Sequence, residues 1–277
     1  VDAGAGLVHC YFLVDRTGSM RTLKAAVVKG FNSYVDEQRQ QPGRMLLTLA
    51  QFSSEATLDI KFEAREIHQV DALGPYEPSG STPLYDALAL LIEHVSRAAD
   101  GRKEVSGSSA AGGEIIIVVF TDGRENASKK HSREDIFKLI QERRKAGWTF
   151  VFLGANQDSF ASSRNLAMAA GATSNYVADS RGVRAAWSDI SGGTSRARKA
   201  LRSGRPQVET DKADFLKGFR SAETDYIERK TAGKGPADRG RGGGRRKRLL
   251  VQRAGGGARA GAGGAHSHQQ ADAHSVH

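Results

Sequence analysis

One carboxylate and two hydroxyls alternate directly after the first apolar segment of the chain. Residues 11–20 read YFLVDRTGSM, so that Asp15, Thr17 and Ser19 follow a hydrophobic run of strand length. In an extended segment, residues two positions apart point to the same side, and Gly18 lets the backbone turn. The three side chains can therefore direct their oxygen atoms toward one point.

Two later segments carry residues of the same kind. Thr82 lies in SGSTPLYDAL and Asp122 in FTDGREN. With the first three residues they supply two carboxylates, three hydroxyls and neither histidine nor cysteine. Such an oxygen-only set suits a hard cation and is unlike a zinc site. We therefore predict a site for Mg²⁺, with Mn²⁺ or Ca²⁺ as alternatives.

The first 180 residues alternate between two hydrophobic periods, one typical of strands and one of helices. Apolar or alternating runs predict strands at Val8–Val14, Met45–Phe52, Thr57–Ile67, Glu114–Thr121, Trp148–Leu153 and Tyr176–Val177. Apolar residues spaced three or four apart predict helices at 22–38, 84–95, 132–146 and 159–170.

This order predicts an α/β fold with a doubly wound, Rossmann-like sheet and helices on both faces. The sheet is expected to be mostly parallel. The Thr57–Ile67 strand follows its predecessor after a short link and should pair with it as an antiparallel edge. Ligands of such sheets bind beyond the carboxyl ends of the strands, where Asp15 and Asp122 are expected.

Charge and composition divide the chain of 277 residues. We predict a domain at 1–180, a charged helical extension at 181–230, and a disordered basic tail rich in Gly, Arg, Ala and His at 231–277. The net charge is +10, and the tail holds most of it. No apolar run is long enough to span a bilayer, so we expect no membrane partner and a cytoplasmic location. The single Cys10 excludes an internal disulfide.

The motifs closely resemble the von Willebrand factor A (VWA) domain, whose metal-ion-dependent adhesion site (MIDAS) reads D-x-S-x-S, then Thr, then Asp. The resemblance covers residues 7–180. It implies that Thr17, Ser19 and Thr82 ligate the ion directly, and that Asp15 and Asp122 do so directly or through water. Thr17 departs from the commoner serine but keeps the hydroxyl. Longer phrases such as VDRTGSM and FLGANQD resemble stand-alone bacterial or phage members.

The resemblance implies protein recognition rather than catalysis. A MIDAS ion leaves one coordination position open, which an Asp or Glu of a protein partner fills. Taken singly, each residue also has a structural interpretation: Asp15 as a turn residue, Asp122-Gly123 as a turn pair, and Thr82 as a helix N-cap.

Two other functions stay open. The basic tail at 231–277 could bind nucleic acid through its phosphates, although the same composition arises from out-of-frame translation of GC-rich DNA. The start FLVDRTG is also similar to that of haloacid-dehalogenase phosphatases, D-x-D-x-T, but Thr17 stands where the second acid is needed. No phosphate-binding G-x-x-x-x-G-K-[ST] occurs. Asn156, Gln157 and Asp158 are expected near the same rim as loop polar groups.

Overall fold

Six strands form one mixed sheet in the order β3-β2-β1-β4-β5-β6. The computed structural model describes residues 6–106, 113–155, 166–205, 208–218 and 220–232. By its contacts the chain divides into two units, 1–235 and 236–277, and all described residues belong to the first. The strands are β1 (Leu7–Asp15), β2 (Arg44–Phe52), β3 (Asp59–Glu66), β4 (Glu114–Thr121), β5 (Thr149–Ala155) and β6 (Thr173–Tyr176).

The pairing confirms the predicted fold class. Strand β1 is parallel to β2 and β4, and β5 is parallel to β4 and β6, whereas β3 runs antiparallel to β2. Strand β3 is the antiparallel edge strand that we expected from the short link between β2 and β3. The carboxyl ends of β1 and β4 therefore lie side by side at one end of the sheet.

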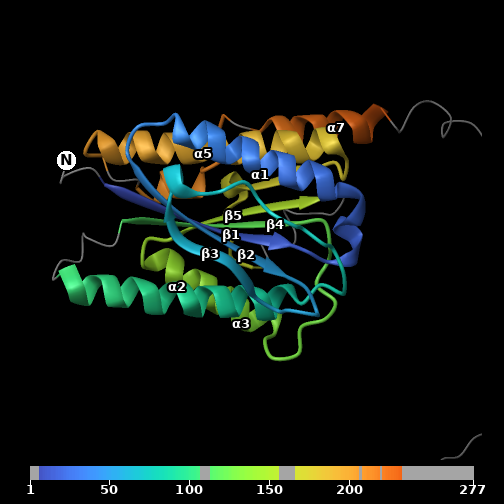
Figure 1. Ribbon diagram of the computed structural model, residues 1–277, viewed down its shortest axis with the longest axis horizontal. Coiled ribbons are helices and arrows are strands. Elements are labelled where there is room, and N and C mark those ends of the chain that lie inside the picture. The colour runs from blue at the N-terminus through green and yellow to red at the C-terminus, as the bar shows by residue number, and fades with distance from the viewer. Residues whose placement is uncertain (1–5, 107–112, 156–165, 206–207, 219, 233–277) are drawn as a thin grey trace, which may run out of the picture. The chain divides into compact units, whose positions relative to one another are not determined.

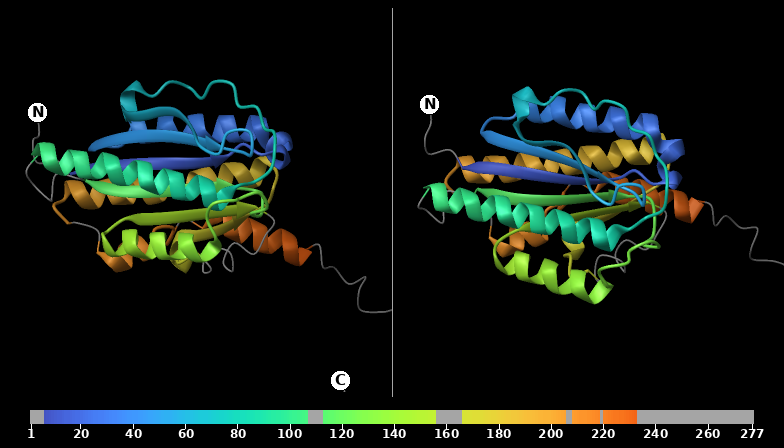
Figure 2. Two further views of the ribbon diagram at one scale, coloured as in Figure 1. Left: turned by 90° about the horizontal axis from the view of Figure 1, so that it is seen from below. Right: turned by 60° about the horizontal axis from the view of Figure 1, so that its bottom comes forward.

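Helices cover both faces of the sheet, as Figures 1 and 2 show. Helices α1 (Lys24–Arg39), α5 (Ser180–Arg202) and α7 (Ser221–Ala232) lie on one face, and α2 (Leu84–Ser106) and α3 (Arg133–Lys145) on the other. Successive side chains of β1 alternate between two cores: Phe12 and Val14 pack toward α1 and α5, whereas Tyr11 and Leu13 pack toward α2. The shorter elements are the 3-10 helices η1 (Gly18–Leu23), η2 (Ile67–Gln69) and η4 (Ala170–Ala172), and α6 (Glu209–Ala213).

Helix α5 lies in the segment 181–230 that we predicted as a charged helical extension, yet it is central to the core. Its Val183, Ala186, Trp187 and Ile190 are buried in the same cluster as the side chains of β1 and α1. The hydrophobic core therefore continues past residue 180, where we drew the first domain boundary. The predicted helix at 159–170 falls largely outside the described residues.

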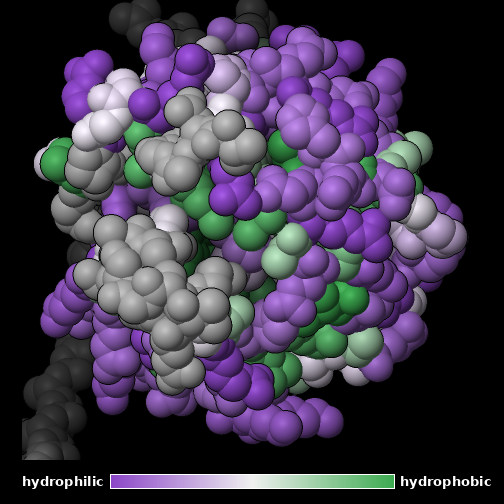
Figure 3. Space-filling model, turned by 60° about the vertical axis from the view of Figure 1, so that its left-hand side comes forward, coloured by the Kyte–Doolittle hydropathy of each residue, from purple (hydrophilic) through white to green (hydrophobic). Residues whose placement is uncertain are grey.

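Hydrophilic side chains predominate on the face of the molecule that Figure 3 shows. Figure 3 shows the face at the left of Figure 1, where hydrophobic side chains form small groups among hydrophilic ones. Large hydrophobic side chains are exposed at Phe137, Val208 and Ile227. Within the described ranges, every helix is too short or too polar to cross a membrane.

Candidate metal centre

Asp15 ends β1 with its side chain fully buried. Its Oδ1 accepts a hydrogen bond from the backbone N–H of Thr17 (2.7 Å), and its Oδ2 accepts one from the hydroxyl of Thr121 (2.5 Å). The first bond is that of a turn in which an aspartate binds the amide two residues on. The second joins Asp15 to the end of the neighbouring strand β4. Asp15 thus has the turn role that the sequence left open and is also fixed between two strands.

Ser19 joins the first predicted segment to the third. Its hydroxyl donates to Oδ1 of Asp122 (2.6 Å), and its Oγ lies 3.2 Å from Oγ1 of Thr17. These residues come from the loops that follow β1 and β4, more than a hundred positions apart in the sequence. The structure therefore brings four of the five predicted residues, Asp15 included, into one hydrogen-bonded group.

Thr82 is brought to the same group beside Gly123. A Cβ atom placed on Gly123 would lie 2.8 Å from Oγ1 of Thr82 and 3.4 Å from Oδ2 of Asp15. Since glycine has no Cβ, a space remains that faces both oxygen atoms. Any side chain at position 123 would fill this space.

The start of α2 shows why the hydroxyl of Thr82 is not used as an N-cap. The backbone N–H of Tyr85 donates to Oε2 of Glu125 (2.9 Å) and to Oγ of Ser128 (3.1 Å), and the N–H of Asp86 also donates to Ser128 (3.1 Å). Side chains of the loop after β4 thus satisfy the amides that a cap residue would bind. Within the described residues, the hydroxyl of Thr82 makes no hydrogen bond. The N-cap interpretation of Thr82 is therefore wrong.

Asp86 holds the loop after β4 from the other side. Its carboxylate accepts hydrogen bonds from the backbone N–H groups of Lys129, Lys130 and His131, at 2.7 to 3.2 Å. Burial raises the pKa of Asp86, but these hydrogen bonds outweigh burial and the pKa lies below its usual value.

Asn126 completes this attachment next to Thr82. The backbone N–H of Thr82 donates to Oδ1 of Asn126 (2.8 Å), and the N–H of Asn126 donates to the carbonyl of Thr82 (3.1 Å). The loop that carries Asp122 and the start of α2 are therefore joined by reciprocal bonds.

The loop after β1 is held by backbone bonds to residues 79–80. The N–H of Gly18 donates to the carbonyl of Gly80 (2.9 Å), and the N–H of Ser79 donates to that of Arg16 (2.9 Å). Gly80 has a φ of +77°, which favours glycine, and a Cβ there would lie 2.5 Å from Oγ of Ser54. The backbone conformation at position 80 and its closeness to Ser54 therefore favour glycine there.

The charges at the site favour a bound cation. Burial raises the pKa of Asp15 to about 6, against the hydrogen bonds from Thr121 and Thr17, and burial also raises the pKa of Asp122. Among the described residues, no lysine or arginine forms an ion pair with either carboxylate. The nearest in sequence, Arg16, is directed to the carbonyl of Glu77 (3.0 Å). A divalent cation would offset the cost of placing two carboxylates here.

The donor set fits a hard cation of the Mg²⁺ type. No group of three or more His, Cys, Asp or Glu that could hold a metal occurs in the described ranges. The site instead combines two carboxylates with three hydroxyls, and oxygen atoms alone are the ligands that Mg²⁺ prefers. The space beside Gly123 supplies room at the same point. The five residues therefore fit the group that the resemblance implies.

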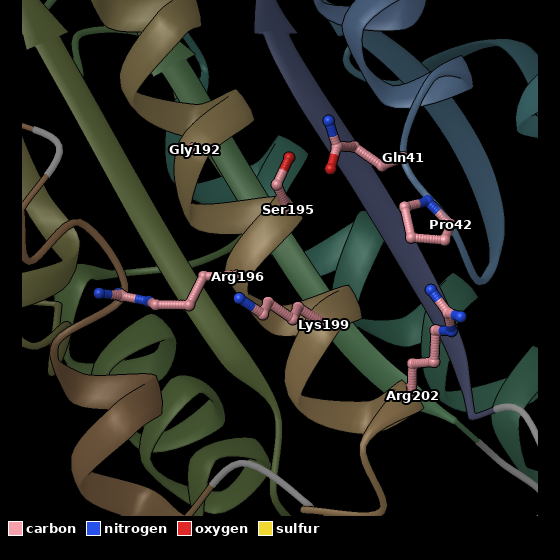
Figure 4. A pocket seen from close by; sticks show the side chains of 7 residues that line it. All are labelled: Gln41, Pro42, Gly192, Ser195, Arg196, Lys199 and Arg202. Carbon is pink, nitrogen blue, oxygen red and sulfur yellow. The ribbon is translucent and has the colours of Figure 1, made fainter.

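A separate cavity of about 480 Å³ lies at the opposite end of the sheet. It is formed by α5 and the residues before β2, and none of the five predicted residues lines it. Figure 4 shows Arg202 reaching toward Pro42, whereas Arg196 extends to the other side of α5. The cavity is thus distinct from the candidate metal centre.

Sequence reasoning missed the residues that position the predicted ligands. Thr121, Glu125, Asn126 and Ser128 stand within or just after FTDGREN, so their closeness to Asp122 was the available signal. Asp86 lies in the quoted phrase SGSTPLYDAL and was equally accessible. Asn156, Gln157 and Asp158 lie outside the described residues.

Several solved structures are similar to this chain at low sequence identity. The pilus adhesin SpaC from Lactobacillus rhamnosus GG matches with a TM-score of 0.51 and 11% identity, over 71% of this chain and 31% of the adhesin. A von Willebrand factor type A protein from Catenulispora acidiphila matches with a TM-score of 0.49 and 14% identity, over 69% and 43%.

Proximal thread matrix protein 1 from the mussel byssus matches with a TM-score of 0.47 and 14% identity, over 70% of this chain and 47% of that protein. This chain therefore spans less than half the length of these three proteins. No curated protein matches the chain significantly.

The comparison with protein families gives a match over the segments that carry the motifs. Residues 10–186 match the von Willebrand factor type A domain, from within β1 to the first turns of α5. The matched range includes all five predicted metal ligands and exceeds half of the chain. The chain belongs to the von Willebrand factor type A domain family.

Proposed function

We propose that this protein binds a divalent cation of the Mg²⁺ type and uses it to bind an acidic side chain of a protein partner. The proposed ligands are Asp15, Thr17, Ser19, Thr82 and Asp122. The observation that carries the proposal is the convergence of three distant segments at the carboxyl end of the sheet, where Ser19 bonds to Asp122 and Gly123 leaves a space facing Thr82 and Asp15.

The five proposed ligands contribute little negative charge. The three hydroxyls are neutral, so with two carboxylates the protein contributes a charge of only −2. A bound divalent cation supplies an electrophilic position for an additional anionic oxygen, such as a carboxylate of a partner. Domains of this family typically bind proteins, which agrees with this proposal.

We infer a binding module rather than an enzyme. A phosphatase of the type that FLVDRTG resembles needs a second acid two positions after the first, and Thr17 occupies that position. The stand-alone bacterial or phage type and the cytoplasmic location stay predictions.

Isothermal titration calorimetry with MgCl₂ and MnCl₂ tests the metal site directly. We expect Asp122→Asn to weaken metal binding by about 100-fold, because removal of a supporting group alone costs roughly 10- to 100-fold. Asp71→Asn is the matched control, since Asp71 is an exposed aspartate that pairs only with Arg65 (2.9 Å) among the described residues.

Binding of a partner carboxylate needs its own measurement. A fluorescein-labelled nonapeptide of alternating Asp and Gly should bind the wild-type protein in Mg²⁺ and lose most of its affinity in EDTA. Peptide binding that EDTA or Asp122→Asn leaves unchanged would overturn the proposed function.

The nucleic-acid alternative rests on residues 231–277, which lie almost entirely outside the described residues. No structural observation favours it, and it stays a prediction from composition.

A further inference from the structure

A groove runs along the outer face of α1 and begins next to the candidate metal centre. Its volume is about 890 Å³, and its second wall is the segment 74–77. The other wall is formed by η1, with Arg21, and by α1, which presents residues spaced three or four positions apart: Ala25, Val28, Asn32 and Asp36.

Contacts at both ends fix the distance between the two walls. Toward the C-terminus of α1, the backbone N–H of Leu73 donates to Oδ1 of Asn32 (2.8 Å). Toward its N-terminus, Nζ of Lys24 lies 2.5 Å from Oε1 of Glu77. The groove is therefore a built feature of the fold and not a gap beside a loose segment.

The same wall is joined to the metal centre. The hydroxyl of Tyr76 donates to the backbone carbonyl of Asp15, and Nη1 of Arg16 donates to the carbonyl of Glu77 (3.0 Å). Tyr76 is fully buried, so that its ring forms part of the base of this wall. The groove wall and the loop that carries the proposed metal ligands are therefore directly hydrogen-bonded to each other.

The charges that remain unpaired in the groove are positive. Lys24 and Glu77 pair with each other, and Asp36 pairs with an arginine of its own helix (2.9 Å). Arg21 and Lys29 are exposed, and neither has an acidic partner among the described residues. The groove therefore attracts anionic groups at two points along its length.

We propose that this groove binds the extended segment that flanks the partner's metal-binding carboxylate, and that Arg21 and Lys29 select segments with further acidic residues. The proposal rests on the proposed function, because the metal centre anchors one end of the segment. Its ligand class is an acidic, extended polypeptide.

The spacing of the two cations sets the length of the segment. Arg21 lies in η1 and Lys29 in α1, eight positions apart, or about 13 Å at rises of about 2.0 Å per residue in a 3-10 helix and about 1.5 Å in an α-helix. An extended peptide rises about 3.3 Å per residue. About four residues of partner therefore span the two cations, so that acidic side chains separated by about four positions match both.

The test compares two labelled nonapeptides by fluorescence anisotropy in Mg²⁺. One alternates Asp and Gly, and the other keeps only the central Asp and carries Asn at the other acidic positions. We expect the wild-type protein to bind the first peptide roughly tenfold more tightly, since each exposed ion pair contributes modestly. The double variant Arg21→Glu, Lys29→Glu should abolish this ratio.

The control variant changes the same charge on the opposite face of the sheet. Lys138→Glu with Lys145→Glu on α3 alters the net charge equally and should keep the ratio. Ala25→Trp places a large side chain in the groove and should also lower the ratio while leaving Mn²⁺ binding unchanged.

The ratio of the affinities for the two peptides separates this proposal from the proposed function, because loss of the metal weakens the binding of both peptides alike. Equal binding of the two peptides by the wild-type protein, or a ratio that Arg21→Glu, Lys29→Glu leaves intact, would overturn the groove as the selecting surface. If in addition EDTA has no effect on either peptide, the proposed function fails as well.

Discussion

Two regions of the domain are held together by different means. Where α5 packs on α1 and the sheet, the ring of Trp187 lies 5.2 to 5.7 Å from those of Phe12, Phe31 and Phe120. A Cβ on Gly30 of α1 would lie only 2.1 Å from the indole. At the carboxyl end of the sheet, hydrogen bonds between loops replace this close packing. Close packing thus dominates around Trp187, whereas hydrogen bonds between loops dominate at the carboxyl end of the sheet.

The difference between these two regions indicates which residues determine stability and which determine binding. Apolar burial in the α1–α5 layer is non-directional and contributes in proportion to area, so it stabilises the fold without placing any single atom. The loop bonds are directional and place oxygen atoms within a few ångströms of each other. Changes in the first region should therefore alter unfolding, and changes in the second should alter binding.

The largest expected effect is that of Trp187→Ala. Truncation of this buried ring should lower the free energy of unfolding by about 3–5 kcal/mol, measured by urea denaturation. Metal affinity of the folded protein should stay as in the wild type. Trp187→Phe is the control and should cost less, because it keeps a ring and removes an indole N–H that has no partner among the described residues. If Trp187→Ala lowered the metal affinity without lowering the free energy of unfolding, the α1–α5 layer would not be the region that determines stability alone.

Thr82→Val should show the opposite behaviour. The hydroxyl of Thr82 makes no hydrogen bond among the described residues, so the free energy of unfolding should change by less than about 0.5 kcal/mol. Mg²⁺ affinity should fall about tenfold, as titration calorimetry can measure. Thr82→Ser keeps the hydroxyl and should retain most of the affinity. A clearly destabilised Thr82→Val would mean that the hydroxyl serves the fold.

Asp86→Asn should give the smallest effect and one that depends on pH. Because the pKa of Asp86 is lowered in the fold, its carboxylate adds stability above the unfolded value of 3.8, and this contribution is lost as the pH falls through the folded pKa. The variant should therefore be less stable than the wild type at pH 7, by about 1 kcal/mol. Urea denaturation at pH 7 and pH 3 should show the difference shrinking at the lower pH. If the difference in the free energy of unfolding between variant and wild type were the same at both pH values, the effect would come from the shape of the side chain and not from its charge.

Most strands follow from hydrophobic pattern, because burial of a central strand on both faces leaves an apolar run such as Ile115–Phe120. Helix α5 lies in the predicted charged helical extension, but its burial in the core was not predicted. Its Gly192-Gly193 pair and its Arg198 are residues whose packing in a core the sequence pattern does not indicate. Phe215 packs so close to Gly193 that a Cβ there would lie 2.4 Å from the ring. Arg198 binds the carbonyls that precede β2. Tertiary contacts that the sequence does not display thus account for the packing at Gly193 and Arg198.

The site was predictable where chemistry is local and unpredictable where it depends on contacts across the chain. Asp15, Thr17 and Ser19 form a recognisable spacing, and the structure brings Asp122 to them as expected. That Glu125 and Ser128 would bind the first amides of α2 could not be read from position, because about 40 residues separate the partners.

Glu125 and Ser128 give this helix a cap that belongs to another loop. The amide protons of Tyr85 and Asp86 cannot exchange with solvent until that loop withdraws, whatever the helix itself does. Their hydrogen–deuterium exchange rates therefore report how often the segment that carries Asp122 opens, without a dye or spin probe attached to the protein.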